Sequence, residues 1–507
     1  MEGLFSATFG ELISRCISFL INKYSTPTSL SKGEILQHLD RMLLRVLITV
    51  EEAEGRSITN QAMLRQLNRL RQDMCRGYYL LDKFRYLAHE EGKAKDLEAS
   101  HHSFALRISN PGKRASLSAS STHGEKELRK MLENIENVVT GMHEFVAFLN
   151  NYPPICRLQP YNMHLVMETC MFGRQVEVQR IISFLLQREP PGEHSLGVGI
   201  LPIVGPGKVG KSTLVEHVCC DIRVRDHFTQ IVLVCGNKFI QGELCTLRDG
   251  GIIKHQNQNG IASEEKILVV IELNGEVDEG AWRKLYSAST SLIPRGSKII
   301  ITSRAENITK FGNTQALWLN FLPREASWYF FKVLAFGSAD PEEHPKLASI
   351  AMEIFEGYFG LEIFNDYTGP FTNPKLIAGF LRANVNIQHW RRVLTCVRGT
   401  RQRNALQFTT TSSGTRGKNQ YLYIQRISKL SQDCVVSRVR VQLAQEDIPK
   451  ITMDEVLYGS ATPKGRFDAV VWKSHLPPHY TYVTSCEICE SKLANRSKSC
   501  QKRKSSC

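Results

Sequence analysis

Apolar residues in the first third of the chain recur at the three- and four-residue steps of amphipathic helices. Together with residues 4–20, three such stripes predict about four helices that bury their apolar faces against one another, as a bundle over residues 1–150. Bundle core is the commoner use of such stripes, and one helix edge could still meet a partner. The stripes are Leu36, Leu39, Leu43, Val46 and Val50; Leu64, Leu67, Leu70, Met74, Tyr78 and Leu81; and Leu128, Leu132, Ile135, Val139, Met142, Val146 and Leu149.

Residues 101–124 interrupt this pattern. They contain six serines, Pro111 and no acidic residue. That composition is typical of a mobile loop rather than a packed element. We therefore expect a loop between the second and third stripes.

The periodicity changes between residues 171 and 335, where short apolar runs rich in Val, Ile and Leu alternate with helical stretches. Near-continuous apolar runs are typical of parallel strands covered on both faces. The pattern predicts a doubly wound α/β domain over residues 165–335, a helical subdomain over 336–400 and a small mixed module over 401–507. The expected strands are 199–204, 230–235, 267–271, 298–302 and 316–319.

A glycine-rich loop follows the first expected strand and matches the phosphate-binding pattern G-x-x-x-x-G-K-[ST]. Its glycines allow a tight turn that aims backbone N–H groups at phosphate oxygens, at the start of a helix whose dipole favours anions. Lys211 would reach the β- and γ-phosphates, Ser212 would ligate Mg²⁺, and Thr213 could contact the α-phosphate. The candidate nucleotide-binding residues are Gly205, Gly207, Lys208, Gly210, Lys211, Ser212 and Thr213.

A nucleotide site of this kind needs an acidic residue at the end of a later strand to hold Mg²⁺. Glu272 ends the strand at 267–271 and can serve the metal, whereas Leu273 cannot polarise water. Glu276, Asp278 and Glu279 follow in the loop beyond, and one of them could compensate. Arg304 follows the next strand, where a guanidinium could sense a γ-phosphate. A surface arginine is the alternative interpretation.

The composition limits the class of protein and the number of domains. The chain of 507 residues is 42% hydrophobic and 22% charged, which is ordinary for a globular protein of about three domains. No leader or membrane span is expected, and 14 scattered cysteines fit reduced thiols in a cytoplasmic protein. Part of the net charge of +14 lies in a basic tail, which we interpret as solvated and disordered, with a nuclear-targeting or anionic-surface patch as the alternative. That tail comprises Lys492, Arg496, Lys498, Lys502, Arg503 and Lys504.

The order of motifs over roughly residues 165–340 resembles the NB-ARC domain of plant disease-resistance (NLR) proteins. The N-terminal helical region looks like the Rx-type coiled-coil domain of the same proteins. Residues 81–84 stand where that family has an acidic motif, here in degraded form. The sequence of the whole chain resembles most a grass-type subgroup of the family. The motifs are Phe172-Gly173-Arg174, the loop 205–213, Asp226-His227-Phe228, the strand ending in Glu272, Trp282, the segment from Gly296 to Arg304, Glu325, and Trp328 to Phe330.

The resemblance implies an ADP/ATP-dependent switch with Mg²⁺ in plant innate immune signalling, at most a slow P-loop ATPase. It implies partners among immune receptor or signalling proteins, met through the N-terminal helices, possible homo- or hetero-oligomers, a cytoplasmic location and no nucleic acid. The helical subdomain is degenerate because Gly360-Leu361-Glu362-Ile363 carries Glu362 where the family has a proline. We find no MHD motif and no leucine-rich repeat, as in a truncated or rewired NLR.

Two other functions stay open. The chain could be a non-catalytic scaffold or decoy that acts through its N-terminal helices and keeps a relic P-loop. A housekeeping NTPase is disfavoured by Leu273. Finally, His475, His479, Cys486 and Cys489 have zinc-like spacing, but two prolines separate the histidines, so we interpret the segment as a loop with incidental cysteines and expect no metal site there.

Overall fold

The computed structural model describes sixteen stretches of the chain, which divide into two compact units. One unit comprises residues 1–176 with 322–353, and the other 177–321 with 354–507. The domain boundaries expected from the sequence stay a prediction. The described stretches are residues 31–56, 58–87, 111–153, 172–187, 198–235, 251–254, 266–273, 279–290, 293–359, 372–410, 421–437, 440–442, 449–459, 461, 463–473 and 481–490.

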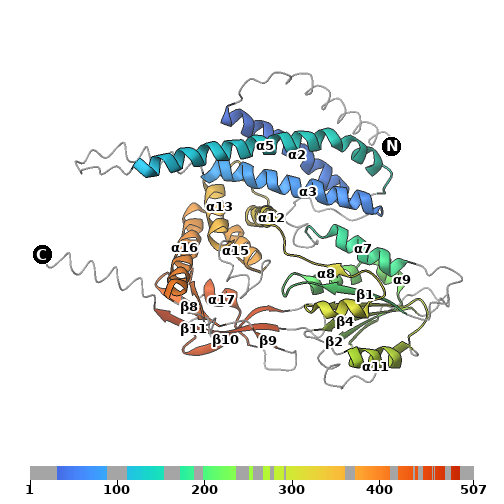
Figure 1. The fold of residues 1–507 in the computed structure, drawn as a ribbon. Helices are drawn as coiled ribbons and strands as arrows, with labels where there is room; N and C mark the ends of the chain where they lie inside the picture. Colours follow the sequence, from blue (N-terminus) through green and yellow to red (C-terminus); the bar gives the residue numbers. More distant parts are fainter. Residues whose placement is uncertain are drawn as a thin grey trace, which may run out of the picture. The chain divides into compact units, whose positions relative to one another are not determined.

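Long helices build the first unit (Figure 1). Helices α2, α3 and α5 pack on one another, and α12 packs on α3. A short π-helical segment, η1, continues α3. The bounds are α2 Lys32–Glu54, α3 Gln61–Asp82, η1 Lys83–Leu87, α5 Pro111–Leu149 and α12 Arg324–Phe336; α13, Pro345–Phe359, begins in this unit and ends in the second.

Local sequence sets where α2 begins and how closely α3 approaches it. Ser31 and Glu34 form a reciprocal capping box, in which the Ser31 N–H donates to Glu34 Oε2 at 2.7 Å. Gly77 lies where α3 faces α2, and a Cβ at this position would come within 2.4 Å of Leu43 Cδ2. The absence of a side chain there lets the two helices pack closely.

The predicted stripes form the core of this unit, with three positions displaced by one residue. Ile35, Tyr79 and Phe145 are buried, whereas their neighbours Leu36, Tyr78 and Val146 are only half-buried. An apolar stripe about 100° wide accepts either of two adjacent positions, so the spacing alone does not choose between them.

Helix α5 begins at Pro111, so residues 111–124 are helical rather than the loop that we expected. Proline suits the first helical position because its fixed φ and missing N–H cost nothing there. The small and basic residues that follow can extend a helix from that point. The serine content alone was therefore a poor indicator of a loop.

A mostly parallel sheet of six strands forms the centre of the second unit, in the order β3-β2-β4-β5-β1-β6. Strand β3 pairs with β2 antiparallel at one edge, and all other pairs in this sheet are parallel. The sequence predicted every parallel strand and missed β3. The bounds are β1 Gly199–Val204, β2 Gln230–Cys235, β3 Gly251–Lys254, β4 Ile267–Leu273, β5 Lys298–Ser303 and β6 Leu317–Trp318.

The strand order places helices on both faces of this sheet. The chain crosses from β1 to β2 in one direction and from β4 to β5 in the other, and right-handed crossovers in opposite directions lie on opposite faces. Figure 1 shows α8 and α9 on one side of the sheet and α11 on the other. The helices and the short 3₁₀ segment around the sheet are α7 Gln175–Leu186, α8 Lys211–Cys219, α9 Ile222–His227, α11 Glu279–Thr290 and η3 Glu306–Phe311.

A second, antiparallel sheet of five strands follows, in the order β10-β11-β8-β7, with β9 also paired to β11. Asn404 of α16 binds one edge of this sheet: its Nδ2 donates to Tyr423 O at 2.8 Å and its Oδ1 accepts from Tyr423 N at 3.1 Å. The elements of this part are α15 Thr372–Ala383, α16 Ile387–Thr410, β7 Leu422–Gln425, β8 Gln432–Val436, β9 Arg440–Gln442, α17 Met453–Leu457, β10 Arg466–Lys473 and β11 Thr481–Glu490.

Candidate nucleotide-binding site

The loop between β1 and α8 has the backbone of a phosphate-binding loop. Gly205 leaves β1 so close to the neighbouring chain that a Cβ would lie 2.4 Å from Leu319 O, and therefore no larger residue fits without a shift. Lys208 and Gly210 adopt left-handed conformations, with φ of 63° and 90°. Gly210 is the N-cap of α8 and provides no side-chain cap. The first N–H groups of α8 are thus oriented as an anion-binding helix terminus requires.

Lys211 folds back over this loop. Its ammonium donates to Gly205 O at 2.7 Å and to Pro206 O at 2.8 Å. Burial, and after it the positive charge of Arg304, lower the pKa of Lys211 to about 8, although the carboxylate of Glu272 acts in the opposite direction. Two cations, Lys211 and Arg304, thus act together with one carboxylate, Glu272. A phosphate would balance the excess of positive charge and stabilise the charged form of Lys211.

Ser212 and Glu272, the two residues expected to associate with Mg²⁺, are in contact with each other. The Ser212 hydroxyl donates to Glu272 Oε1 at 2.8 Å, which joins the first turn of α8 to the carboxyl end of β4. Burial raises the pKa of Glu272, while the Ser212 hydrogen bond, Lys211 and Arg304 act in the opposite direction. One hydroxyl and one carboxylate side by side are oxygen ligands of the kind that Mg²⁺ prefers. The residues present therefore fit a magnesium ion bound with a nucleotide.

The position after Glu272 supplies no catalytic carboxylate. Leu273 is buried in the apolar core of the sheet with 2% of its surface exposed. Glu279, one of the possible substitutes, pairs with Arg283 one turn further along α11. Glu276 and Asp278 lie outside the described residues, as does the segment from Gly360 to Ile363 with Glu362.

Arg304 completes the group of charged side chains. It follows β5, and a Cβ on Gly207 would lie 3.0 Å from Arg304 Cζ, so the guanidinium rests against the loop where Gly207 has no side chain. The loop, Glu272 and Arg304 thus come from the carboxyl ends of β1, β4 and β5, where parallel α/β sheets bind ligands. Thr213 is exposed on α8, and the described contacts give it no role.

Tyr482 is the residue of this group that sequence reasoning missed. It lies on β11 in the same compact unit as the phosphate-binding loop. Burial raises the pKa of Tyr482, Glu272 raises it too, and Arg304 opposes both, so Tyr482 lies within the field of both charged groups. No sequence motif marks this tyrosine, because it lies on a strand of the second sheet, far from the phosphate-binding loop in the sequence.

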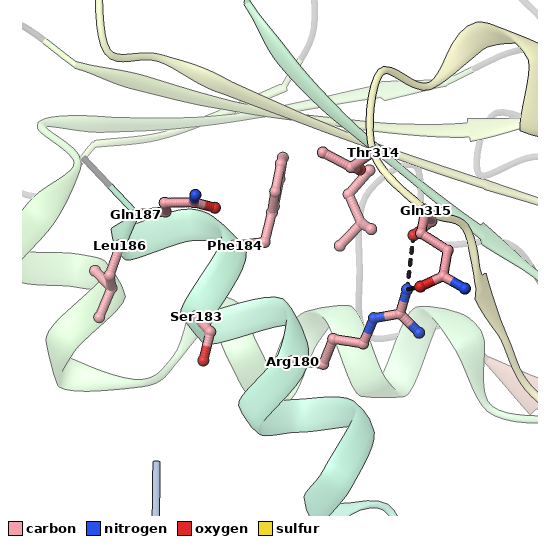
Figure 2. A pocket seen from close by; sticks show the side chains of 8 residues that line it. Arg180, Ser183, Phe184, Leu186, Gln187, Thr314 and Gln315 are labelled. Carbon is pink, nitrogen blue, oxygen red and sulfur yellow. Dashed lines mark hydrogen bonds between the residues drawn. The ribbon is translucent and has the colours of Figure 1, made fainter. Parts of the chain in front are cut away.

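A pocket of about 520 Å³ lies elsewhere in this unit, between α7 and residues 314–315. Figure 2 shows Arg180 reaching from α7 towards Gln315, and its Nη2 donates to Gln315 O at 2.8 Å. The guanidinium therefore holds the neighbouring loop in place. This pocket contains none of the phosphate-loop residues and is separate from the candidate site.

Two further features concern metal binding and membrane insertion in the described part of the chain. No group of His, Cys, Asp and Glu side chains there has the geometry of a metal site. Cys486 lies buried with its Sγ 3.5 Å from Met453 Sδ, whereas His475 and His479 fall outside the described residues. Within the same stretches, no helix is both long and apolar enough to cross a membrane.

The sheet, the loop and the charged cluster define a P-loop nucleotide-binding α/β domain. Residues 174–340 match the family model of the NB-ARC domain. Disease resistance protein RGA2 of Solanum bulbocastanum is 26% identical over 214 residues, which cover 39% of this chain and 21% of that protein. Putative disease resistance RPP13-like protein 1 of Arabidopsis thaliana is 23% identical over 384 residues, 71% of this chain and 34% of the relative.

The matches therefore span a fifth to a third of these relatives' own lengths. Among solved structures, domain III of the Thermotoga maritima replication initiation protein DnaA aligns with 51% of this chain and 94% of that one, at 13% identity and a TM-score of 0.22. A score that low adds nothing to the argument. Residues 174–340 are thus similar to the NB-ARC domain, and the chain is similar to plant disease-resistance proteins.

Proposed function

We propose that this protein is an ADP/ATP-binding switch in plant defence signalling, and that nucleotide exchange changes how its N-terminal helices meet partner proteins. The observation that carries the proposal is the meeting of Ser212 and Glu272 at 2.8 Å, beside Lys211 and Arg304. A relic loop has no need to keep a hydroxyl, a carboxylate and two cations together.

The similarity to disease-resistance proteins supports the cellular role, and the helices of the first unit support an Rx-type N-terminal domain. We propose a cytoplasmic location. Hydrolysis is at most slow in this proposal, because Leu273 is packed into the core and cannot orient a water molecule. The switch would then be governed by nucleotide exchange rather than by turnover.

The nucleotide content of the purified chain tests the proposal. We expect one ADP per chain when the protein is denatured and its supernatant is separated by anion exchange. Exchange into ATP should require Mg²⁺, and Glu272→Gln should weaken that requirement because it removes the negative charge next to Ser212. A chain that holds no nucleotide and takes up none, with or without Mg²⁺, would favour the scaffold interpretation instead.

We also expect the affinity for ADP to fall as the pH rises from about 7 to 9. Lys211 is a cation below its pKa of about 8 and neutral above it, so the attraction for the β-phosphate is lost through this range. The loss should approach tenfold for each pH unit above the pKa, since one proton is involved. Titration with a fluorescent ADP analogue at several pH values measures it.

Lys211→Arg is the matched control for this pH dependence. A guanidinium stays charged throughout this range, so the variant should show a flat profile whatever its affinity. A flat profile for the unmodified chain would contradict the assignment of Lys211 as the phosphate cation.

A further inference from the structure

The pocket beside α7 has walls that the fold holds in place. Helix α7 forms one wall, Leu201 of β1 forms the second, and the loop between η3 and β6 forms the third. Thr314 of this loop donates from Oγ1 to Ile200 O at 2.8 Å, and Arg180 Nη2 ties Gln315 O to α7 at 2.8 Å. The cavity is therefore formed before a ligand arrives, which lowers the cost of binding one.

The inside of this pocket is apolar, with one cation at its side. Phe184, Leu186 and Leu201 supply the apolar surface. Arg180 is the charged member of the lining that the structure describes, and no carboxylate belongs to that lining. Arg180 and Phe184 are four residues apart and so lie on one face of α7, and Figure 2 shows both reaching towards the loop. A ligand with an apolar body and a negative group at one end would match this arrangement.

Arg180 has donors left for such a ligand. Its described hydrogen bonds all use Nη2, which donates to Gln315 O, to Gln315 Oε1 at 3.3 Å and to Ala316 O at 3.4 Å. These acceptors are neutral and do not balance the guanidinium charge. A carboxylate would bind with a charge-assisted hydrogen bond, about twice as strong as a neutral one. One carboxylate also matches one guanidinium, whereas a phosphate monoester carries about −1.5 to −2 charges at pH 7.

A second cation lies behind the Phe184 ring. Lys298, the first residue of β5, is only 7% exposed, and its Nζ lies 5.5 Å from the centroid of that ring. Gly199 makes room for it, because a Cβ there would come within 3.0 Å of Lys298 Nζ. Among the described residues, no carboxylate pairs with Lys298. The ammonium thus keeps the field near the pocket positive, which favours an anion over an amine.

We propose that this pocket binds a small organic acid, with its carboxylate on Arg180 and its apolar body against Phe184 and Leu201. The volume of about 520 Å³ is typical of a site for a small molecule. The organic acid would be a second ligand besides the nucleotide, because the pocket contains no residue of the phosphate-binding loop. The inference does not depend on the proposed nucleotide-binding function.

Phenylacetate, phenylpropionate and phenylbutyrate are suitable probes, each compared with its primary amide as the neutral match. Ligand-observed NMR titrations on the full chain measure the dissociation constants. We expect at least one acid to bind in the millimolar range, since so small a ligand makes few contacts. Its amide should bind about tenfold more weakly, because a neutral hydrogen bond replaces the charge-assisted one.

Two variants locate the binding. Ser183 is exposed on α7 and lines the pocket, so Ser183→Phe should fill the space and abolish binding of acid and amide. Arg180→Met should weaken binding of the acid about tenfold and leave the amide nearly unchanged, whereas a merely loosened loop would weaken both. Arg283→Met, at an exposed arginine of α11, is the matched control. Lys211→Ala should bind the acids as the unmodified chain does, which separates this pocket from the phosphate-binding loop.

Hydrogen exchange supplies a second readout. Amides of residues 180–187 should become better protected when the acid is added to the unmodified chain, and should not change in Ser183→Phe. The inference is wrong if none of the acids binds, if acid and amide bind equally, or if Ser183→Phe or Arg180→Met binds the acid as the unmodified chain does. ADP binding is measured separately, so none of these results bears on the nucleotide site.

Discussion

Replacing Lys211 with alanine is expected to leave the purified chain without bound nucleotide. The change removes the ammonium that donates to Gly205 O and Pro206 O, and with it the cation that would face the phosphates. Truncating one partner of a charge pair at a largely desolvated site costs about 2 to 5 kcal/mol, so the affinity for ADP should fall at least about 30-fold. Calorimetric titration with ADP, together with the nucleotide content after purification, measures the loss.

Lys310→Ala is the matched control, because Lys310 is an exposed lysine of the same unit on η3. It should retain ADP as the unmodified chain does. Equal thermal unfolding of the two variants would show that the loss in Lys211→Ala is a loss of binding rather than of folding. ADP affinity within a few-fold of the unmodified value in Lys211→Ala would remove the basis for the site.

The sequence was informative about the central sheet because buried parallel strands and their loops have strong local patterns. The expected strands at 199–204 and 230–235 coincide with β1 and β2. Strand β3 was not predicted. Its four residues pair antiparallel at the edge of the sheet, and an apolar run of that length is too short to indicate a strand. The geometry of Ser212 and Glu272 followed from the rule that parallel strands end at one edge.

Contacts between distant elements were not accessible in this way. Tyr482 lies on a strand of the second sheet, yet Arg304 and Glu272 of the first sheet's edge act on its pKa. Asp82 is a similar case. The sequence indicated that it belongs to a short motif at residues 81–84, but it did not indicate which side chains Asp82 contacts. Those partners come from α12, some 250 residues further along the chain. Spacing rules act within an element, whereas such pairs depend on the packing of whole helices.

Replacing Asp82 with alanine is expected to destabilise the helical unit strongly. The carboxylate has 1% of its surface exposed and accepts from Trp328 Nε1 at 2.9 Å and from Lys332 Nζ at 2.7 Å. Its loss leaves the Lys332 ammonium, whose side chain is 15% exposed, without its carboxylate. Breaking a buried pair from one side costs about 3 to 5 kcal/mol.

Hydrogen exchange is the suitable measurement, because a chain of two units need not unfold in a single step. Protection of the α3 and α12 amides should fall by about two to four orders of magnitude in Asp82→Ala, in proportion to the lost free energy. Glu133→Ala, at an exposed carboxylate on α5, should change little. The double variant Asp82→Leu with Lys332→Met should recover much of the protection, since it removes both charges and keeps their volume. Unchanged protection in Asp82→Ala would mean that the ion pair does not hold α12 on α3. Apolar contacts would then be enough to hold the two helices together, such as that between Tyr78 and Tyr329, whose ring centroids lie 5.7 Å apart.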